Sequence, residues 1–321
     1  MKEPFIVTDK EIKFSFVYTR VDYPKFSTNI KTLVSTADYA VSQLKDSSLE
    51  NNYLYDYTIA KEMQRVSFVI EVLKESLEND GFDVFYQPIY SFETNDFTQA
   101  EALVRLKNAN ENNLYPGEFI PIAEKSDLII KLTYIIIEKV CKHFQIIKNT
   151  YGKNNKLASI SINFPYKIFF QKNLLQNVME ILKHYSISPS EIKIEITERS
   201  LISDDSTVKN VISKMKEKGF IFELDDFGVE YSNMSVFLKL PINYIKIDKS
   251  LVDIAIANKS YRPFFQNLVQ GIQSLGKSII VEGVEDKEQL NFIEKCGCEY
   301  IQGYVFSKPL TLVDFQNFLH K

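Results

Sequence analysis

Eight short apolar segments recur along the chain from residue 84 onward, and helical segments separate most of them. This alternation is typical of parallel β/α construction, in which each helix connects two strands of one sheet. Eight such units predict an α/β fold of the TIM (β/α)8 barrel type. An open doubly wound sheet is the alternative, but no GxGxxG or P-loop sequence follows any segment. The expected strands are residues 84–90, 100–106, 158–164, 192–197, 221–225, 244–247, 278–282 and 300–306, and the expected helices are residues 58–79, 116–125, 132–150, 174–185, 206–218, 262–275 and 287–296.

Almost every expected strand after the first ends, or nearly ends, with a carboxylate, an amide or an amine. In this type of barrel the carboxyl ends of the strands meet at one mouth, where active sites gather. So many carboxylates repel one another unless cations neutralise them. Oxygen ligands without Cys or His favour Mg²⁺ or Mn²⁺, and the adjacent Asp225 and Asp226 suit two bridged ions that activate a water for phosphodiester hydrolysis. The polar residues are Glu101, Asn163, Glu195, Asp225, Asp226, Lys246, Glu282 and Gln302.

Each of these residues taken alone has a simpler interpretation, because an acid between apolar residues of a strand can face solvent by simple alternation. Lys246 is then an ion-pair partner of a neighbouring acid, and Gln302 is a hydrogen-bonding residue at a strand end. Asp248 and Glu198 are expected to be structural rather than direct metal ligands. The joint pattern favours a site, because buried acids are rare unless they are paired or bound to a metal.

Composition narrows the classes of ligand and metal. A formal net charge of −4 argues against binding of duplex nucleic acid, which needs clustered cations. Three cysteines without a CxxC pair and three histidines argue against a zinc–thiolate site. The same cysteine usage fits a reducing cytosol.

Nothing in the sequence predicts a targeting or membrane segment. Residues 1–13 alternate charged and apolar side chains and lack the continuous apolar region of a secretory signal. The most apolar later stretch, residues 128–140, is interrupted by three charged residues and is too short to cross a bilayer. We therefore expect a cytoplasmic chain, with any membrane anchor in a longer parent protein.

The character of the chain changes near residue 60, where we place a domain boundary. Residues 1–60 offer one strand at 12–18 and one helix at 32–44, which is too little for a self-sufficient domain. We expect this piece to form a small α+β appendage to a main domain of residues 61–321. Its run S-T-A-D-Y-A at residues 35–40 resembles the last part of a GGDEF domain, the diguanylate cyclase module. The GGDEF motif itself is absent, so the resemblance implies a partial or degenerate segment without cyclase activity.

The main domain resembles the EAL family, because its motifs follow the order of that family along residues 62–321. The tripeptide Glu-Ala-Leu alone carries no weight, whereas the ordered series is specific. The motifs are FYQPI from residue 85, EALVR from 101, PGEFIPIAE from 116, EITE from 195, DDFG from 225, KIDKS from 246, EGVE from 282 and GCEYIQGY from 297.

The resemblance implies a modified TIM barrel, often a homodimer, whose two-metal site hydrolyses cyclic di-GMP to linear pGpG. Lys246 resembles the lysine that holds the attacking water, and Glu282 resembles a group that receives its proton. Glu285 and Gln302 resemble supporting residues beside the metals and the nucleophile. Arg105 resembles a contact to the substrate phosphate, for which a guanidinium fork is suited. The metal ligands that the resemblance implies are Glu101, Asn163, Glu195, Asp225, Asp226 and Glu282.

One loop departs from the family pattern. Val229 and Glu230 follow Asp-Phe-Gly, where the family usually has Thr or Ala and then Gly. A glutamate where the backbone needs positive φ costs about 1 kcal/mol or more, which predicts weakened activity or altered regulation. Glu198, which resembles the glutamate that braces this loop, is present and favours partial retention.

Three functions therefore stay open. The first is an active, metal-dependent phosphodiesterase. The second is a catalytically weak cyclic di-GMP receptor, motivated by Val229 and Glu230. The third, which is independent of the resemblance, is an enolase-type barrel in which Lys246 removes a carbon-bound proton. The tandem Asp225 and Asp226, together with Arg105, favour phosphodiester chemistry over proton abstraction.

Overall fold

The computed structural model describes residues 57–197, 206–228 and 241–320, together with short pieces of residues 1–56. The chain divides into two compact units, Met1–Val72 and Leu73–Lys321. Helix α2 (Tyr57–Glu78) contains the point of division. The boundary near residue 60 and the GGDEF-like assignment of residues 1–60 stay predictions.

The first unit contains two small strand pairs among its described residues. Strands β1 (Phe5–Val7) and β2 (Lys10–Ile12) pair antiparallel. Strands β3 (Tyr18–Arg20) and β4 (Asn52–Leu54) pair in parallel. Within the helix expected at 32–44, the described residues 34, 37, 38 and 41 are helical. Most of the strand expected at 12–18 lies outside the described residues.

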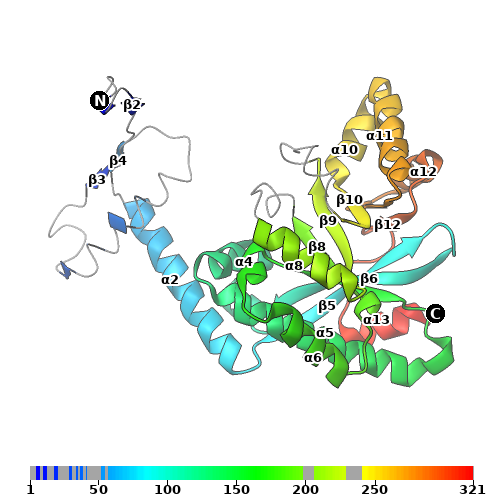
Figure 1. The fold of residues 1–321 in the computed structure, drawn as a ribbon, viewed down its shortest axis with the longest axis horizontal. Helices are drawn as coiled ribbons and strands as arrows, with labels where there is room; N and C mark the ends of the chain where they lie inside the picture. The colour runs from blue at the N-terminus through cyan, green and yellow to red at the C-terminus, as the bar shows by residue number, and fades with distance from the viewer. Residues whose placement is uncertain are drawn as a thin grey trace. The chain divides into compact units, whose positions relative to one another are not determined.

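The second unit is built around a closed barrel of eight strands in the order β10-β11-β12-β5-β6-β7-β8-β9 (Figure 1). The predicted α/β barrel class is therefore confirmed, and each expected strand overlaps one strand of the barrel. The strands are β5 (Phe82–Ser91), β6 (Asp96–Leu106), β7 (Ser159–Asn163), β8 (Ile192–Thr197), β9 (Ile221–Phe227), β10 (Tyr244–Ile247), β11 (Ser278–Val281) and β12 (Tyr300–Gln302).

The barrel departs from uniform parallel construction at one strand. Strand β5 runs antiparallel to both of its neighbours, β6 and β12, whereas the other neighbouring pairs are parallel. The reason is its connection: β5 continues into β6 through a short turn at residues 92–95, and a hairpin reverses the chain. The expectation of parallel β/α units thus holds for seven of the eight strands.

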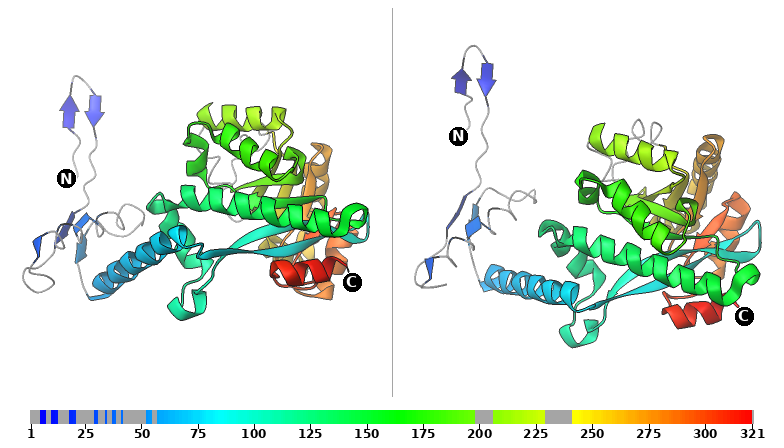
Figure 2. Two further views of the ribbon diagram at one scale, coloured as in Figure 1. Left: turned by 90° about the horizontal axis from the view of Figure 1, so that it is seen from below. Right: turned by 60° about the horizontal axis from the view of Figure 1, so that its bottom comes forward.

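Helices surround much of the barrel (Figure 2), and strands β7, β8 and β11 are each buried at every residue but one. Strand β8 shows the result, because five consecutive residues from Ile192 to Ile196 are buried. Parallel strands covered by helices read as apolar runs, and a charged residue in such a run points into the barrel. The charged residues of these strands are therefore the ones that bear on function.

The remaining helices follow the predicted alternation, and three described helices that the sequence did not predict are also present, at Ala109–Asn112, Lys249–Ala257 and Leu312–Leu319. Helix α5 is the expected core helix, and it buries Ile136, Ile137, Val140 and Phe144. None of the helices in the described part of the chain is long and apolar enough to cross a membrane. The helices are α3 (Ala109–Asn112), α4 (Pro116–Lys125), α5 (Leu128–Tyr151), α6 (Leu174–His184), α8 (Ser206–Glu217), α10 (Lys249–Ala257), α11 (Arg262–Ser274), α12 (Lys287–Cys296) and α13 (Leu312–Leu319), with short 3-10 turns at Gly152–Asn154, Tyr166–Phe170, Pro189–Glu191 and Lys259–Tyr261.

Candidate active site

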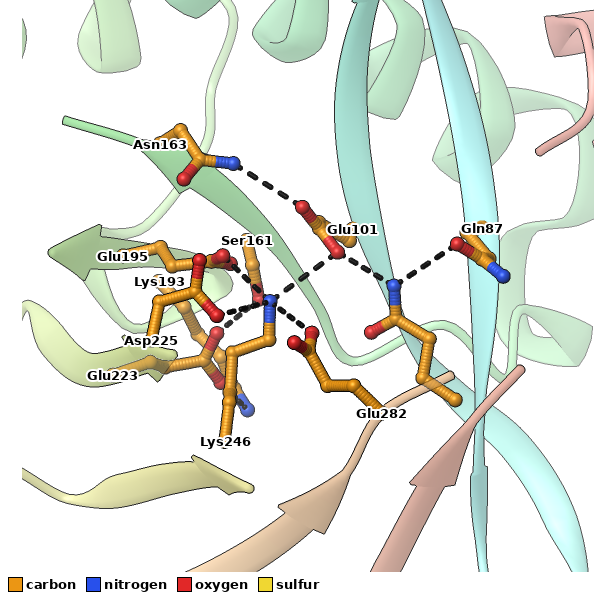
Figure 3. A network of polar contacts seen from close by, with 11 residues as sticks. Gln87, Glu101, Ser161, Asn163, Lys193, Glu195, Glu223, Asp225, Lys246 and Glu282 are labelled. Atoms are coloured by element: carbon orange, nitrogen blue, oxygen red, sulfur yellow. Dashed lines mark hydrogen bonds and ion pairs between the residues drawn. The ribbon is translucent and has the colours of Figure 1, made fainter. Parts of the chain in front are cut away.

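Seven of the polar residues expected at the strand ends meet at one place in the barrel. They come from seven different strands or from the residue that follows a strand, so each strand contributes one side chain. Figure 3 shows six of them by label, with their carboxylate, amide and ammonium groups directed toward one another. The residues are Glu101 on β6, Asn163 on β7, Glu195 on β8, Asp225 on β9, Lys246 on β10, Glu282 after β11 and Gln302 on β12.

The ammonium group of Lys246 lies at the centre of this site (Figure 3). Its Nζ is 2.6 Å from Glu195 Oε1, 2.6 Å from Glu282 Oε1, 3.2 Å from Glu101 Oε2 and 3.7 Å from Asp225 Oδ1. Burial alone lowers the pKa of a lysine, but these four carboxylates outweigh it and raise the pKa of Lys246 well above its ordinary value. Lys246 is therefore a positively charged donor.

The carboxylates are crowded and differ in their affinity for protons. Burial, together with the charge of neighbouring acids, raises the pKa of Glu195 and Glu282 well above the ordinary value. Burial also acts to raise the pKa of Asp225, but Lys246 and the hydrogen bonds around it lower it overall. One of those bonds comes from the backbone N–H of Asp226. One lysine against four acids leaves negative charge in excess.

The donor set fits a hard divalent cation. One carboxylate oxygen each from Glu101, Glu195 and Glu282 lie within 4.8 Å of one another. Glu195 Oε2, Asp225 Oδ1 and Gln302 Oε1 are buried and have no hydrogen-bond partner among the described residues. Buried polar atoms rarely lack partners, and oxygens without partners beside excess negative charge are what Mg²⁺ or Mn²⁺ prefers.

Two amides hold the carboxylate of Glu101. Asn163 Nδ2 donates to Glu101 Oε1 at 3.2 Å, and Gln302 Nε2 donates to Glu101 Oε2 at 2.5 Å. Gln302 Nε2 also lies 3.2 Å from Gln87 Oε1, which ties β12 to β5. Gln302 is thus a strand-end hydrogen-bonding residue, and one of its acceptors is a residue of the site.

Four other predicted site residues are not among the seven converging side chains, and one of the four lies outside the described residues. Asp226 is exposed and has a left-handed backbone with φ of 57°. Arg105 is half-buried, donates to the carbonyl of Val104 at 2.9 Å and lies over the ring of Phe85. Glu285 is exposed and pairs with Lys249 at 2.6 Å. Glu198, like Val229 and Glu230, lies outside the described residues.

Asp248 has the structural role that the sequence predicts. Its carboxylate accepts the backbone N–H of Ser250 and caps the N-terminus of α10. It holds the start of the helix that follows Lys246 and is not one of the converging ligands.

Sequence reasoning missed five further buried polar residues, of which Gln87 lies opposite Glu101 on the paired strand and the other four lie deeper in the barrel. Gln87, Gln99, Ser161, Lys193 and Glu223 are all buried. Their signal was present, because Gln99, Ser161, Lys193 and Glu223 each stand two positions before a predicted site residue. Side chains two positions apart on a strand point the same way.

Comparison with protein families and known proteins agrees with the geometry. A model described as the EAL domain matches residues 70–309. The signaling protein YkoW of Bacillus subtilis is 31% identical over 319 residues, which are 99% of this chain and 39% of that protein. The probable cyclic di-GMP phosphodiesterase PdeB of Escherichia coli is 31% identical over 253 residues, 79% of this chain and 47% of that protein. The chain thus spans less than half the length of these relatives.

Solved structures share the fold. The EAL enzyme Bd1971 in its cGMP-bound form aligns with a TM-score of 0.75 at 23% identity, over 92% of this chain and 78% of that one. The PaMucR phosphodiesterase in complex with c-di-GMP aligns with a TM-score of 0.70 at 24% identity, over 77% of this chain and 99% of that one. With an EAL model matched over three quarters of its length, the chain belongs to the EAL-domain family.

Proposed function

We propose that the chain hydrolyses cyclic di-GMP to linear pGpG and that the reaction depends on two Mg²⁺ or Mn²⁺ ions. The observation that carries the proposal is the convergence of Glu101, Glu195 and Glu282 within 4.8 Å, beside buried oxygens that have no hydrogen-bond partner among the described residues. The names of the relatives support the substrate, since PdeB is called a probable cyclic di-GMP phosphodiesterase and NbdA of Pseudomonas aeruginosa a cyclic di-GMP phosphodiesterase.

The proposed ligands are oxygen donors from β6, β7, β8 and β9 and from the residue that follows β11. When bound, the ions would lower the pKa of the attacking water and neutralise charge on the phosphate and on the leaving oxygen. The negative excess around Lys246 supports this, because the bare site holds four acids against one ammonium. The ligands are Glu101, Asn163, Glu195, Asp225, Asp226 and Glu282.

Lys246 and Glu282 carry the proton and charge steps that the chain itself performs. The raised pKa keeps Lys246 charged at neutral pH, so its Nζ orients the attacking water and stabilises developing negative charge. Glu282, whose Oε1 lies 2.6 Å from Lys246 Nζ, is proposed to accept the proton that the water loses. The charged state of Lys246 also speaks against the enolase-type hypothesis, which needs the lysine as a base.

The remaining predicted residues have supporting roles in this proposal. Gln302 fixes Glu101 through its 2.5 Å hydrogen bond, and Glu285 steadies the loop after Glu282 through its ion pair with Lys249. We assign Arg105, whose guanidinium lies over the ring of Phe85, to the substrate phosphate. The family resemblance assigns Glu198 to bracing the loop after Asp226. The active form is a cytoplasmic homodimer.

The receptor hypothesis depends on Val229 and Glu230, which lie outside the described residues. No described feature favours it over hydrolysis, because the acids and the lysine expected of the enzyme are together. Binding of cyclic di-GMP without hydrolysis would be the result that supports it.

The test is incubation of the purified chain with cyclic di-GMP in Mg²⁺, in Mn²⁺ and in EDTA, with the products separated by chromatography. We expect pGpG only with metal, and turnover at least about 100-fold lower in Glu101→Gln, which removes a ligand charge at constant size. Glu294→Gln, the same change at an exposed acid of α12, is the control and should behave as wild type. Intact cyclic di-GMP in every reaction would contradict the proposal. Calorimetric binding without turnover would then support the receptor.

A further inference from the structure

A second polar layer lies inside the barrel, one step deeper than the site. We define this lower layer by Gln99, Ser161, Lys193 and Glu223. Each stands two residues before a site residue on the same strand, so the layer lies directly behind Glu101, Asn163, Glu195 and Asp225.

Hydrogen bonds join the lower layer across four neighbouring strands. Lys193 Nζ on β8 lies 2.7 Å from Glu223 Oε1 on β9 and 2.5 Å from Gln99 Oε1 on β6. Ser161 Oγ on β7 donates to Glu223 Oε2 at 2.5 Å. Both oxygens of Glu223 therefore have a partner, and Figure 3 shows Ser161, Lys193 and Glu223 together. With Gln99, these contacts connect β6 to β9.

Two tyrosine rings lie near the ammonium group of Lys193. Lys193 Nζ lies 3.4 Å from the ring centroid of Tyr244 and 5.9 Å from that of Tyr300. These rings stand two residues before Lys246 and Gln302, so β10 and β12 follow the same rule as the other four strands. Six strands thus contribute one residue to the site and one to the support behind it.

A contribution to stability does not by itself explain why Lys193 and Glu223 are paired inside the barrel. The side chain of Lys193 is 1% exposed and that of Glu223 is 0% exposed, and replacing such a buried pair by apolar residues is often neutral or stabilising. The pair is also electrically neutral, so it adds nothing to the negative excess of the site. What it does supply is a fixed, directional link between β8 and β9, whose next inward residues are Glu195 and Asp225.

We propose that Lys193 and Glu223 are positioning residues, which hold the carboxylates of Glu195 and Asp225 at the spacing that a divalent cation needs. Residues that orient metal ligands typically change metal affinity or activity by about 10- to 100-fold when they are removed. The inference rests on the proposed function only for its turnover readout, because affinity for Mn²⁺ is measured without substrate.

The test uses the double variant Lys193→Met with Glu223→Gln, which removes the ion pair and leaves no unpaired charge. We expect Mn²⁺ binding, measured by calorimetry, to weaken about tenfold or more. We expect kcat for cyclic di-GMP to fall by a similar factor at unchanged KM. The matched control is Lys148→Met with Glu191→Gln, which removes a 2.7 Å ion pair between α5 and the turn before β8, outside the barrel. It should bind Mn²⁺ as wild type does.

Mn²⁺ affinity and kcat within about twofold of the control would overturn the proposal, whatever the change in melting temperature. If the double variant does not fold, Ser161→Ala replaces it, because this change removes only the hydroxyl that Glu223 accepts. Weaker Mn²⁺ binding by Ser161→Ala supports the proposal, and unchanged binding overturns it. A wild-type chain that binds Mn²⁺ but leaves cyclic di-GMP intact would contradict the proposed function alone.

Discussion

Lys246 Nζ lies 2.6 Å from Glu195 Oε1, and both side chains are buried in the barrel. The same ammonium group pairs with Glu282, Glu101 and Asp225, so without bound metal it is the cation that holds these acids together. Coulomb repulsion between buried carboxylates is strong at such short range. The lysine of the proposed catalytic step is therefore also a counter-ion of the metal-free fold.

Replacement of Lys246 by methionine should make the stability of the protein depend on metal. In EDTA we expect the free energy of unfolding to fall by about 3–5 kcal/mol, because removing one partner leaves buried charges uncompensated. Mn²⁺ should restore most of the loss, which denaturant titration with and without the ion measures. Lys249→Met, which removes an exposed ion pair with Glu285, is the control and should cost about 1 kcal/mol or less. Equal stability of Lys246→Met and wild type in EDTA would contradict the counter-ion role.

Metal binding should strengthen as the pH rises. The pKa values of Glu195 and Glu282 are raised from the ordinary 4.5, chiefly by burial, so the metal-free folded state holds protons that the unfolded chain has released. Its stability therefore falls as the pH rises from about 4.5 through the raised values, and a cation that replaces those protons offsets the loss.

We accordingly expect the rise in melting temperature that Mg²⁺ causes to be larger at about pH 8 than at about pH 6. Scanning calorimetry at fixed ionic strength measures it. Glu282→Gln, which removes one of the two titrating groups, should show a smaller difference between the two pH values. A Mg²⁺-induced rise in melting temperature that is equal at the two pH values, or larger at the lower pH, would show that protons and Mg²⁺ do not compete for these acids.

Much of the site was predictable because a strand of a covered barrel has apolar neighbours on both sides. An acid such as Glu195 in the run Ile-Glu-Ile then has few places to point except inward. Convergence followed from the fold, since the ends of parallel strands share one mouth. The antiparallel direction of β5 was not predictable in this way, because the period of side chains along a strand is the same in both directions.

The contacts of the lower layer could not be predicted from the sequence alone. Lys193 stands between isoleucines just as Glu195 does, yet a single lysine in a strand reads equally well as a solvent-facing residue. Only the pairing of Lys193 with Glu223, 30 positions away, distinguishes the two, and that contact is set by the closure of the barrel. The central place of Lys246 among four acids likewise depends on tertiary contacts with residues up to 145 positions away.

Gln302 should affect turnover through Glu101 rather than through substrate binding. Gln302→Leu removes the 2.5 Å hydrogen bond to Glu101 Oε2, so we expect kcat to fall by about 10- to 100-fold and Mn²⁺ affinity to weaken. Gln87→Leu removes the 3.2 Å contact behind Gln302 and a 3.3 Å hydrogen bond to the carbonyl of Ser307, and should have a smaller effect. Steady-state kinetics on both variants shows which of them loses more kcat. A rise in KM at unchanged kcat for Gln302→Leu would instead place this amide on the substrate.

Gly303, the residue after Gln302, should tolerate no side chain. A Cβ at this position would lie 2.0 Å from the carbonyl oxygen of Val284 and 2.4 Å from its nitrogen, and both are backbone atoms that cannot rotate away. The same backbone is fixed from both sides, because Val284 N donates to Gln302 O at 3.2 Å and Val305 N donates to Val284 O at 2.9 Å. Gly303→Ala must therefore separate the loop after Glu282 from the end of β12.

We expect Gly303→Ala to lower the free energy of unfolding by about 1–3 kcal/mol or more, as overpacking of a tight contact does. Turnover should fall further than stability explains, because the strained loop carries Glu282 and the strand carries Gln302. Gly271→Ala is the matched control: nothing lies within 4 Å of its Cβ position inside α11, so alanine should stabilise that helix by about 0.5–1 kcal/mol. Urea titration of both variants gives the comparison. Wild-type stability in Gly303→Ala would mean that this loop can move away from β12, and Glu282 would then lack the fixed position that its proposed role as a ligand and proton acceptor requires.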